Sequence, residues 1–170
     1  MKLKIKNLEL GTKNGFTLIE LLLVITIFSV LFTAMILVIN PVRKAKLARD
    51  AVRKQDLQVL SRAIEAYYID NLRNLPATGE THLSTDGSPP QNSAGAGWIP
   101  ANLSLQLKTL PNDTINSGQY FYRYFGESTP GSARFKLDAI LEADTKASQN
   151  DGGVDPARFE VGTDKSLLPP

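Results

Sequence analysis

The residue types that carry most enzymatic chemistry are scarce in this chain of 170 residues. It contains no cysteine, which excludes a disulfide framework, a thiolate metal site and a cysteine nucleophile. Its single histidine, His82, lies among Gly, Ser and Thr residues, so we expect neither a His-rich metal site nor a Ser/His/Asp triad. A phosphate-binding loop is not expected either, because Gly95 and Gly97 run directly into Trp98-Ile99-Pro100. The sequence therefore predicts that the protein is not an enzyme and uses no cofactor.

One carboxylate stands out because it lies inside a long apolar segment. From Phe16 to Ile39, 19 of 24 residues are apolar, and Glu20 is the only acid among them. A helix of this length is about 36 Å long, enough to span a hydrocarbon core of about 30 Å. The 17 Leu, Ile, Val and Phe residues contribute about −5 to −10 kcal/mol to insertion, which outweighs one carboxylate. We therefore predict a transmembrane helix over residues 16–40, in which Glu20 marks a functional position.

The flanks of the apolar segment distinguish it from a cleavable secretory signal. Such a signal has an apolar stretch of about 7 to 15 residues that ends in small residues, whereas this segment ends in Val38-Ile39-Asn40-Pro41. Lys and Arg residues lie on both sides, so counting them does not decide the orientation in the membrane. Pro41 lacks a backbone N–H and clashes with the preceding helical turn, so we predict a helix kink there.

After residue 40, the sequence predicts an amphipathic helix, a loop and a β-rich head. Over residues 41–75, apolar side chains recur at spacings of three and four, which predicts a continued helix with one face in a core. This stripe comprises Leu57, Leu60, Ile64 and Tyr67. Residues 76–97 contain 13 Gly, Pro, Ser or Thr residues among 22 and predict a flexible loop. Residues 98–170 form the head, with strands predicted over residues 120–125, 135–141 and 158–161. The predicted fold is α+β, with a long N-terminal helix packed against a small antiparallel sheet.

The residues around Glu20 resemble a known processing signal. The stretch Lys13-Asn-Gly15-Phe16-Thr-Leu-Ile-Glu20 follows a Lys-bearing leader and resembles the class III signal of type IV prepilins and type II secretion pseudopilins. This resemblance implies a pilin-like fold and a leader, residues 1–15, that prepilin peptidase removes between Gly15 and Phe16. It also implies that Phe16 is N-methylated and that Glu20 guides assembly. Gly15 suits such a cleavage because a residue without a Cβ can thread through a narrow cleft in an extended conformation.

Two roles for Glu20 are open from the sequence. Cleavage would leave an ammonium group on Phe16, which needs a carboxylate as counter-charge in an apolar bundle. Glu20 of a neighbouring subunit meets that ammonium only at a matching axial offset, which would set the register of a filament. Alternatively, Glu20 lies four residues after Phe16 and can pair with the amine of its own chain, where it also favours the helix N-terminal dipole.

The resemblance implies a structural function, as a pilin or pseudopilin subunit of a type IV pilus or a type II secretion-like filament. Implied partners are copies of the chain or related pilin subunits, prepilin peptidase, and an inner-membrane platform protein with its assembly ATPase. The implied location is the bacterial cytoplasmic membrane, crossed once with the head extracytoplasmic, followed by a periplasmic or cell-surface filament. The alternative is a monomeric, single-span membrane-anchored binding module, whose N-terminus would stay uncut.

Charge is distributed unevenly along the chain. The net charge is +3 over residues 1–15, +4 over residues 43–65 and −4 over residues 66–170. We expect the basic segment to face membrane lipid headgroups or the acidic heads of neighbouring subunits. Nucleic acid is not an expected partner, because the basic segment lies directly beside the predicted membrane helix.

A cluster of oxygen-bearing side chains near the C-terminus is considered as a calcium-binding site. Some secretion pseudopilins bind Ca²⁺ through a C-terminal loop, and this chain carries four candidate ligands beside Gly152-Gly153. They are Asp144, Asn150, Asp151 and Asp155. Their spacing is not that of an EF-hand loop, and an Asp/Asn/Gly cluster between strands is usually a turn. The predicted site therefore includes no metal.

Overall fold

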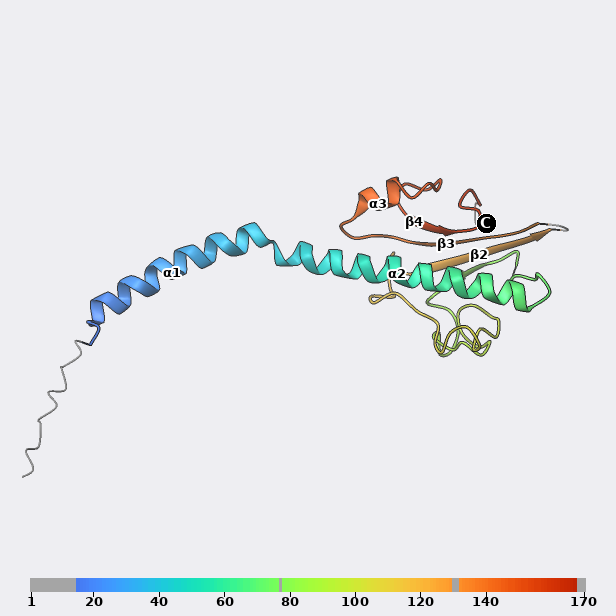
Figure 1. The fold of residues 1–170 in the computed structure, drawn as a ribbon, viewed down its shortest axis with the longest axis horizontal. Coiled ribbons are helices and arrows are strands. Elements are labelled where there is room, and N and C mark those ends of the chain that lie inside the picture. The colour runs from blue at the N-terminus through green and yellow to red at the C-terminus, as the bar shows by residue number, and fades with distance from the viewer. Residues whose placement is uncertain (1–14, 77, 130–131, 168–170) are drawn as a thin grey trace, which may run out of the picture. The chain divides into compact units, whose positions relative to one another are not determined.

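The computed structural model describes residues 15–76, 78–129 and 132–167 (Figure 1). The chain divides into two compact units, one up to Pro41 and one from Val42 onward. In chain order, the elements are α1 (Leu18–Ile39), α2 (Pro41–Asp70), β1 (Thr81–Leu83), β2 (Tyr122–Thr129), β3 (Ser132–Ala139), α3 (Thr145–Gln149) and β4 (Phe159–Gly162).

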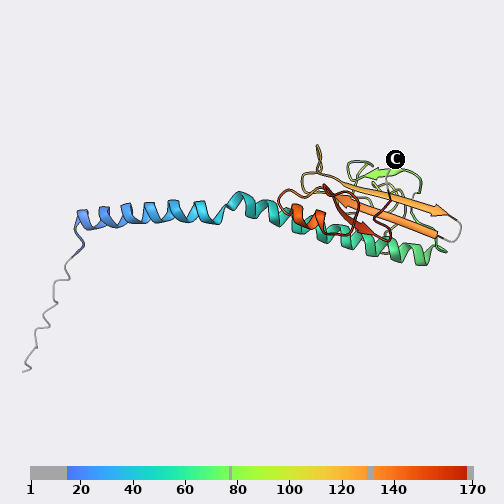
Figure 2. The same cartoon turned by 90° about the horizontal axis from the view of Figure 1, so that it is seen from above.

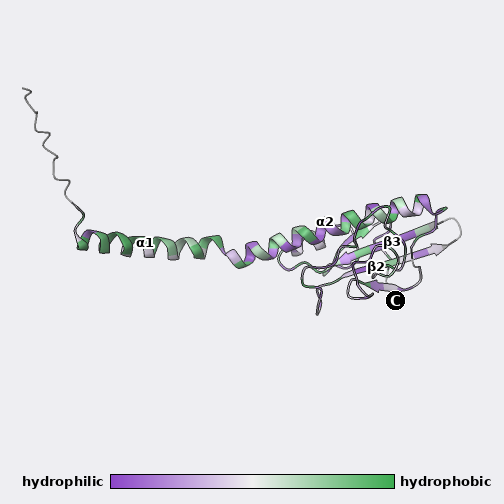
Figure 3. Ribbon diagram, turned by 90° about the horizontal axis from the view of Figure 1, so that it is seen from below, coloured by the Kyte–Doolittle hydropathy of each residue, from purple (hydrophilic) through white to green (hydrophobic). Residues whose placement is uncertain are grey.

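The first unit consists of the apolar helix α1. It is 22 residues long and almost uniformly hydrophobic around its circumference, as its colouring shows (Figure 3). The helix ends at Ile39, because Asn40 adopts a left-handed conformation with φ of 45° directly before Pro41. Pro41 is the first residue of α2, a position where the missing N–H costs no helical hydrogen bond. The chain thus leaves helical geometry at the predicted place, while the kink itself stays a prediction.

In the second unit, α2 packs along a sheet through the predicted apolar stripe (Figures 1 and 2). Leu57, Leu60 and Ile64 are fully buried, and Tyr67 is partly buried against the same cluster. The opposite face of the helix is polar, which gives the amphipathic pattern that the sequence predicts. The helix therefore supplies one layer of a two-layer head.

The sheet has four antiparallel strands in the order β1-β2-β3-β4. β2 and β3 pair over their whole length, with Tyr122 opposite Ala139 and Thr129 opposite Ser132. β4 then pairs with the second half of β3. The helix and this sheet confirm the predicted pilin-like α+β fold.

The structure corrects the prediction of a loop throughout residues 76–97, because β1 lies within that segment. Its residues Thr81–Leu83 pair with β2, and the amide of Ser84 extends the ladder by donating to the Tyr122 carbonyl at 2.9 Å. Three residues among many Gly, Pro, Ser and Thr give no alternating pattern, so composition conceals the strand. Pairing with the edge of β2 determines its conformation instead.

The segment before β2 contributes much of the head core, although it contains no long element. Trp98, Ile99, Leu103 and Leu110 are buried among the side chains of α2, β2 and β3. The indole N–H of Trp98 donates to the Pro111 carbonyl at 2.9 Å, which satisfies the one polar atom of that side chain. Packing of this segment against the sheet therefore compensates for its lack of regular structure.

Candidate functional site

The predicted cleavage junction lies at the start of the described chain. No described atom lies within 4 Å of the position that a Cβ on Gly15 would occupy, and the Phe16 side chain is 90% exposed. The rest of the predicted leader, residues 1–14, lies outside the described residues. Gly15 and Phe16 are thus accessible in the folded chain, and their role in cleavage and methylation stays a prediction.

Glu20 lies in the first turn of α1, where it forms a capping box with Thr17. Thr17 is the N-cap residue, and its side chain accepts a hydrogen bond from the Glu20 amide at 3.3 Å. The Glu20 carboxylate accepts in return from the Thr17 amide at 2.8 Å and from the Thr17 hydroxyl at 2.9 Å. Two helix-terminal amides that would otherwise lack partners are satisfied in this way.

Sequence reasoning missed the part played by Thr17. The signal was available, because a Thr followed three residues later by Glu before an apolar run is the pattern of a capping box. The carboxylate therefore has partners within its own chain, as one of the two predicted roles requires, although the partner is Thr17 rather than the Phe16 amine. Pairing with a neighbouring subunit stays a prediction.

The other polar side chains of α1 are also satisfied within the helix. The hydroxyls of Thr26, Ser29 and Thr33 donate to the carbonyls of Leu23, Ile25 and Ser29 at 2.7 to 2.8 Å. A helix whose hydroxyls bond to its own backbone can enter an apolar environment without unpaired polar groups. Among the described residues, one helix is long and apolar enough to cross a membrane, and α1 supplies its apolar part.

In the second unit, a buried arginine joins α2 to the rest of the head. The Arg53 side chain is fully buried and donates to Asp113 at 2.6 and 3.1 Å, to Glu142 at 2.8 Å and to Asp50 at 2.9 Å. Its guanidinium also lies 4.8 Å from the centre of the Tyr120 ring. One cation on α2 is therefore held by carboxylates from three parts of the chain.

Asp50 extends this connection from the previous turn of α2. Its buried carboxylate accepts hydrogen bonds from the backbone amides of residues 142, 143 and 144 at 2.7 to 3.0 Å. Arg49 forms a bidentate pair with Glu142, and Lys54 pairs with Asp144 at 2.6 Å. We call Arg49, Asp50, Arg53, Lys54, Asp113, Glu142 and Asp144 the head anchor.

The head anchor changes the interpretation of the charge asymmetry. We expected the basic segment 43–65 to face lipid or the acidic heads of neighbouring subunits. Three of its cations, Arg49, Arg53 and Lys54, instead pair with carboxylates of their own head. The spacing of charges along the sequence could not distinguish these cases, because the partners lie 60 to 93 residues away.

The chain matches the family described as the prokaryotic N-terminal methylation motif over residues 11–36. It is also similar to type II secretion system core protein G of Pseudomonas aeruginosa, with 29% identity over 148 residues. These residues make up 87% of this chain and 96% of the relative. No solved structure matches the chain. The chain thus carries a methylation motif at its N-terminus and is similar to a type II secretion protein over most of its length. The resemblance found around Gly15, Phe16 and Glu20 is thereby confirmed, and it extends over nearly the whole chain.

The C-terminal loop that carries the candidate calcium ligands does not present a ligand set. Among the described residues, no group of three or more Asp, Glu, His or Cys side chains is placed to hold a metal ion. Asp144 is paired with Lys54, and Asp151 accepts the amides of Gly153 and Glu160, both at 2.7 Å. Asp155 accepts the Ala157 amide at 2.9 Å. These carboxylates do not fit a calcium ion, because each is directed to a different partner in the chain.

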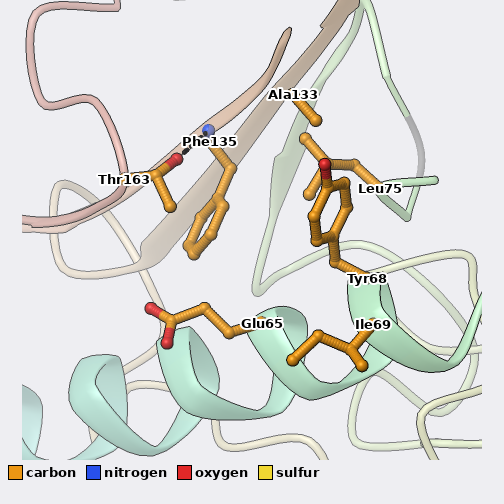
Figure 4. A pocket seen from close by; sticks show the side chains of 7 residues that line it. All are labelled: Glu65, Tyr68, Ile69, Leu75, Ala133, Phe135 and Thr163. Carbon is orange, nitrogen blue, oxygen red and sulfur yellow. Dashed lines mark hydrogen bonds between the residues drawn. The ribbon is translucent and has the colours of Figure 1, made fainter. Parts of the chain in front are cut away.

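The head also contains a mainly apolar cavity of about 370 Å³ beside the C-terminal half of α2 (Figure 4). It is lined by Glu65, Tyr68, Ile69, Leu75, Ala133, Phe135 and Thr163. The Thr163 hydroxyl accepts the backbone amide of Phe135 at 3.0 Å. The lining thus combines one carboxylate and two hydroxyl groups with four apolar side chains.

We predict from the head anchor that the folded head loses stability in acid. Hydrogen bonds from Arg49, followed by those from Arg53, lower the pKa of Glu142 from 4.5 to about 2 despite burial. Because the folded-state pKa is below that of the unfolded chain, the stabilisation is complete above about pH 4.5 and is lost as the pH falls towards 2. We expect the urea midpoint of the wild type to approach that of Glu142→Gln over this window. A difference between the two proteins that stays constant from pH 6 to pH 2.5 would contradict the assignment.

Proposed function

We propose that this chain is a structural subunit of a type IV pilus or type II secretion-like filament. In this proposal, prepilin peptidase removes residues 1–15, Phe16 becomes the N-methylated first residue, and the mature chain polymerises from the membrane through α1. The methylation motif and the similarity to a type II secretion core protein support this assignment. The head has a structural role, and the chain performs no reaction of its own.

The observation that carries the proposal is the surface of α1. The large apolar side chains described along this helix are exposed, from Val38 at 85% to Val24 at 42%. A continuous apolar surface of this kind needs a bilayer, a bundle of similar helices, or each in turn. A subunit that is first anchored in the membrane and then packed into a filament core supplies both environments to the same side chains.

In this proposal, Glu20 is the charged group that aligns neighbouring α1 helices. Once Phe16 is the N-terminus, its amine carries a positive charge and lies one helical turn before the carboxylate. In a bundle of apolar helices, the two charges are neutralised only when neighbouring subunits are offset by the distance that brings them together. We propose that this pairing sets the axial register, with the Thr17 capping box holding the carboxylate until a neighbour arrives.

The same proposal implies a cellular location and a membrane topology for the protein. The precursor would cross the bacterial inner membrane once, with the head on the extracytoplasmic side, before joining a periplasmic or surface filament. Its partners would be copies or related pilin subunits, prepilin peptidase, the inner-membrane platform protein with its assembly ATPase, and lipid around α1. An inner-membrane anchor agrees with the one candidate membrane helix among the described residues.

A monomeric, membrane-anchored binding module is the second candidate, and the capping box favours it. Because Thr17 already satisfies the Glu20 carboxylate, the single chain needs no neighbour for this group. Intact-mass spectrometry of protein purified from membranes distinguishes the two candidates. A mature chain that begins at a methylated Phe16 supports the filament subunit, whereas an uncut N-terminus supports the module.

We expect Gly15→Val to block maturation without affecting membrane insertion. The branched side chain prevents residue 15 from passing through a narrow extended cleft, while the apolar segment that drives insertion is unchanged. Intact-mass spectrometry should find a precursor that keeps its 15-residue leader in the membrane fraction. Normally shortened Gly15→Val protein would remove the peptidase assignment.

A further inference from the structure

The face of the sheet that points away from α2 is charged and yet buried. Lys136 and Asp138 of β3 lie on this face, together with Arg158 and with Glu160 of β4, and none of these residues is more than 5% exposed. Arg158 donates to Asp138, which also accepts from Arg123 at 2.8 Å. The ion pairs lie within this face, and the loop between α3 and β4 contacts it through Asp151, Asp155 and Arg158.

The least exposed of these pairs joins Lys136 to Glu160. The Lys136 ammonium lies 2.7 Å from Glu160 Oε1, and the exposed fractions of the two side chains are 2% and 0%. Lys136 lies opposite Gly162 in the ladder, so Glu160 is its diagonal neighbour on the same face. Each charge is therefore compensated only if the other remains in place.

The loop between α3 and β4 closes around the Glu160 carboxylate. Its Oε2 accepts the Asp155 amide at 3.1 Å, while the Glu160 amide donates to Asp151 at 2.7 Å. A Cβ on Gly153 would lie 1.6 Å from Glu160 Oε2, so a side chain there would displace the carboxylate from its position beside the loop backbone. Lys165 donates to the Asp151 carbonyl and attaches the same loop to the chain after β4.

We propose that the Lys136 ammonium is the cation that closes this loop, so that the head of this chain is stable without a divalent cation. The carboxylates of Asp151 and Asp155 in the loop bind backbone amides, and the fully buried carboxylate of Glu160 on β4 already has a cation from the protein. This inference concerns the folding of the head and does not depend on filament assembly.

The test is thermal unfolding of the full chain in detergent, monitored by near-UV circular dichroism. We expect the wild-type Tm to be the same in 5 mM CaCl₂ and in EDTA. A Tm that falls in EDTA and recovers with calcium would overturn the proposal.

Variants of the pair test the role of the ammonium itself. Lys136→Met keeps most of the aliphatic stem, removes the charge and should lower the Tm by roughly 5 to 10 °C, because a buried carboxylate loses its partner. Lys146→Met, at an exposed lysine of α3, is the matched control and should leave the Tm unchanged. If Lys136→Met does not fold, Glu160→Gln combined with Lys136→Met should restore folding, because no unpaired charge is left. The proposal would be contradicted by a Lys136→Met protein as stable as the wild type. It would also be contradicted by a double variant that is no more stable than Lys136→Met.

Discussion

Glu20→Val is expected to leave protein of mature length in the membrane and to abolish filaments. Insertion should persist, because valine is more apolar than the carboxylate and α1 is otherwise unchanged. Cleavage should persist too, because residue 20 lies more than one helical turn beyond the junction after Gly15. Assembly should fail, because every Phe16 ammonium in the bundle would lack its counter-charge, and the defect recurs at each subunit. Electron microscopy of sheared filaments and intact-mass spectrometry of membranes measure the two results separately.

Two matched variants separate the register role from the capping role. Glu20→Asp keeps the charge on a side chain shorter by one methylene, so it should assemble poorly but better than Glu20→Val. Thr17→Val removes the hydroxyl of the capping box but keeps the carboxylate and the backbone amide that donates to it. We expect Thr17→Val to form more filaments than Glu20→Val. Abundant homopolymers of Glu20→Val would refute the register role, whereas equal defects in the two variants would mean that Glu20 acts through the cap.

The sequence predicted the features that depend on local periodicity. The apolar run, its end near Pro41, and the buried stripe of α2 follow from helical spacing, and the structure places Leu57, Leu60 and Ile64 in the core. The three longer strands were found within a few residues of their observed bounds, because aromatic and alternating residues mark them. For these elements, the local pattern and the tertiary packing require the same conformation.

Features that depend on partners far along the chain were not predictable in this way. β1 has three residues, and its conformation comes from pairing with β2 rather than from its own composition. Arg53 resembles any exposed cation of an amphipathic helix, and only folding brings Asp113 and Glu142 to it. The burial of Lys136 and Asp138 on β3 was not predictable for the same reason, because the alternation gives one face of the strand without showing what covers it.

Replacing Arg53 should be the most damaging single change to the stability of the head. Arg53→Met preserves much of the aliphatic stem but removes the buried cation that Asp50, Asp113 and Glu142 share. Breaking a buried pair by removing one partner costs about 3 to 5 kcal/mol, because the remaining charges stay desolvated. Since a domain is stabilised by about 5 to 15 kcal/mol in total, we expect a large fall in the urea midpoint, with partial unfolding at physiological temperature.

The matched control for Arg53→Met lies on the same helix. Arg62→Met removes a cation from an exposed position of α2, so its free energy of unfolding should stay within about 0.5 kcal/mol of the wild type. Arg49→Met should fall between the two, because Arg49 is one-third exposed and Arg53 would still pair with Glu142. If Arg53→Met and Arg62→Met unfold at the same urea concentration, the head anchor contributes no net stability, and apolar packing alone holds the head on α2. If the expected order is found, Arg49 and Arg53 of α2 stabilise the attachment of the helix to its own head. Contacts with neighbouring subunits would then involve charged residues outside the head anchor.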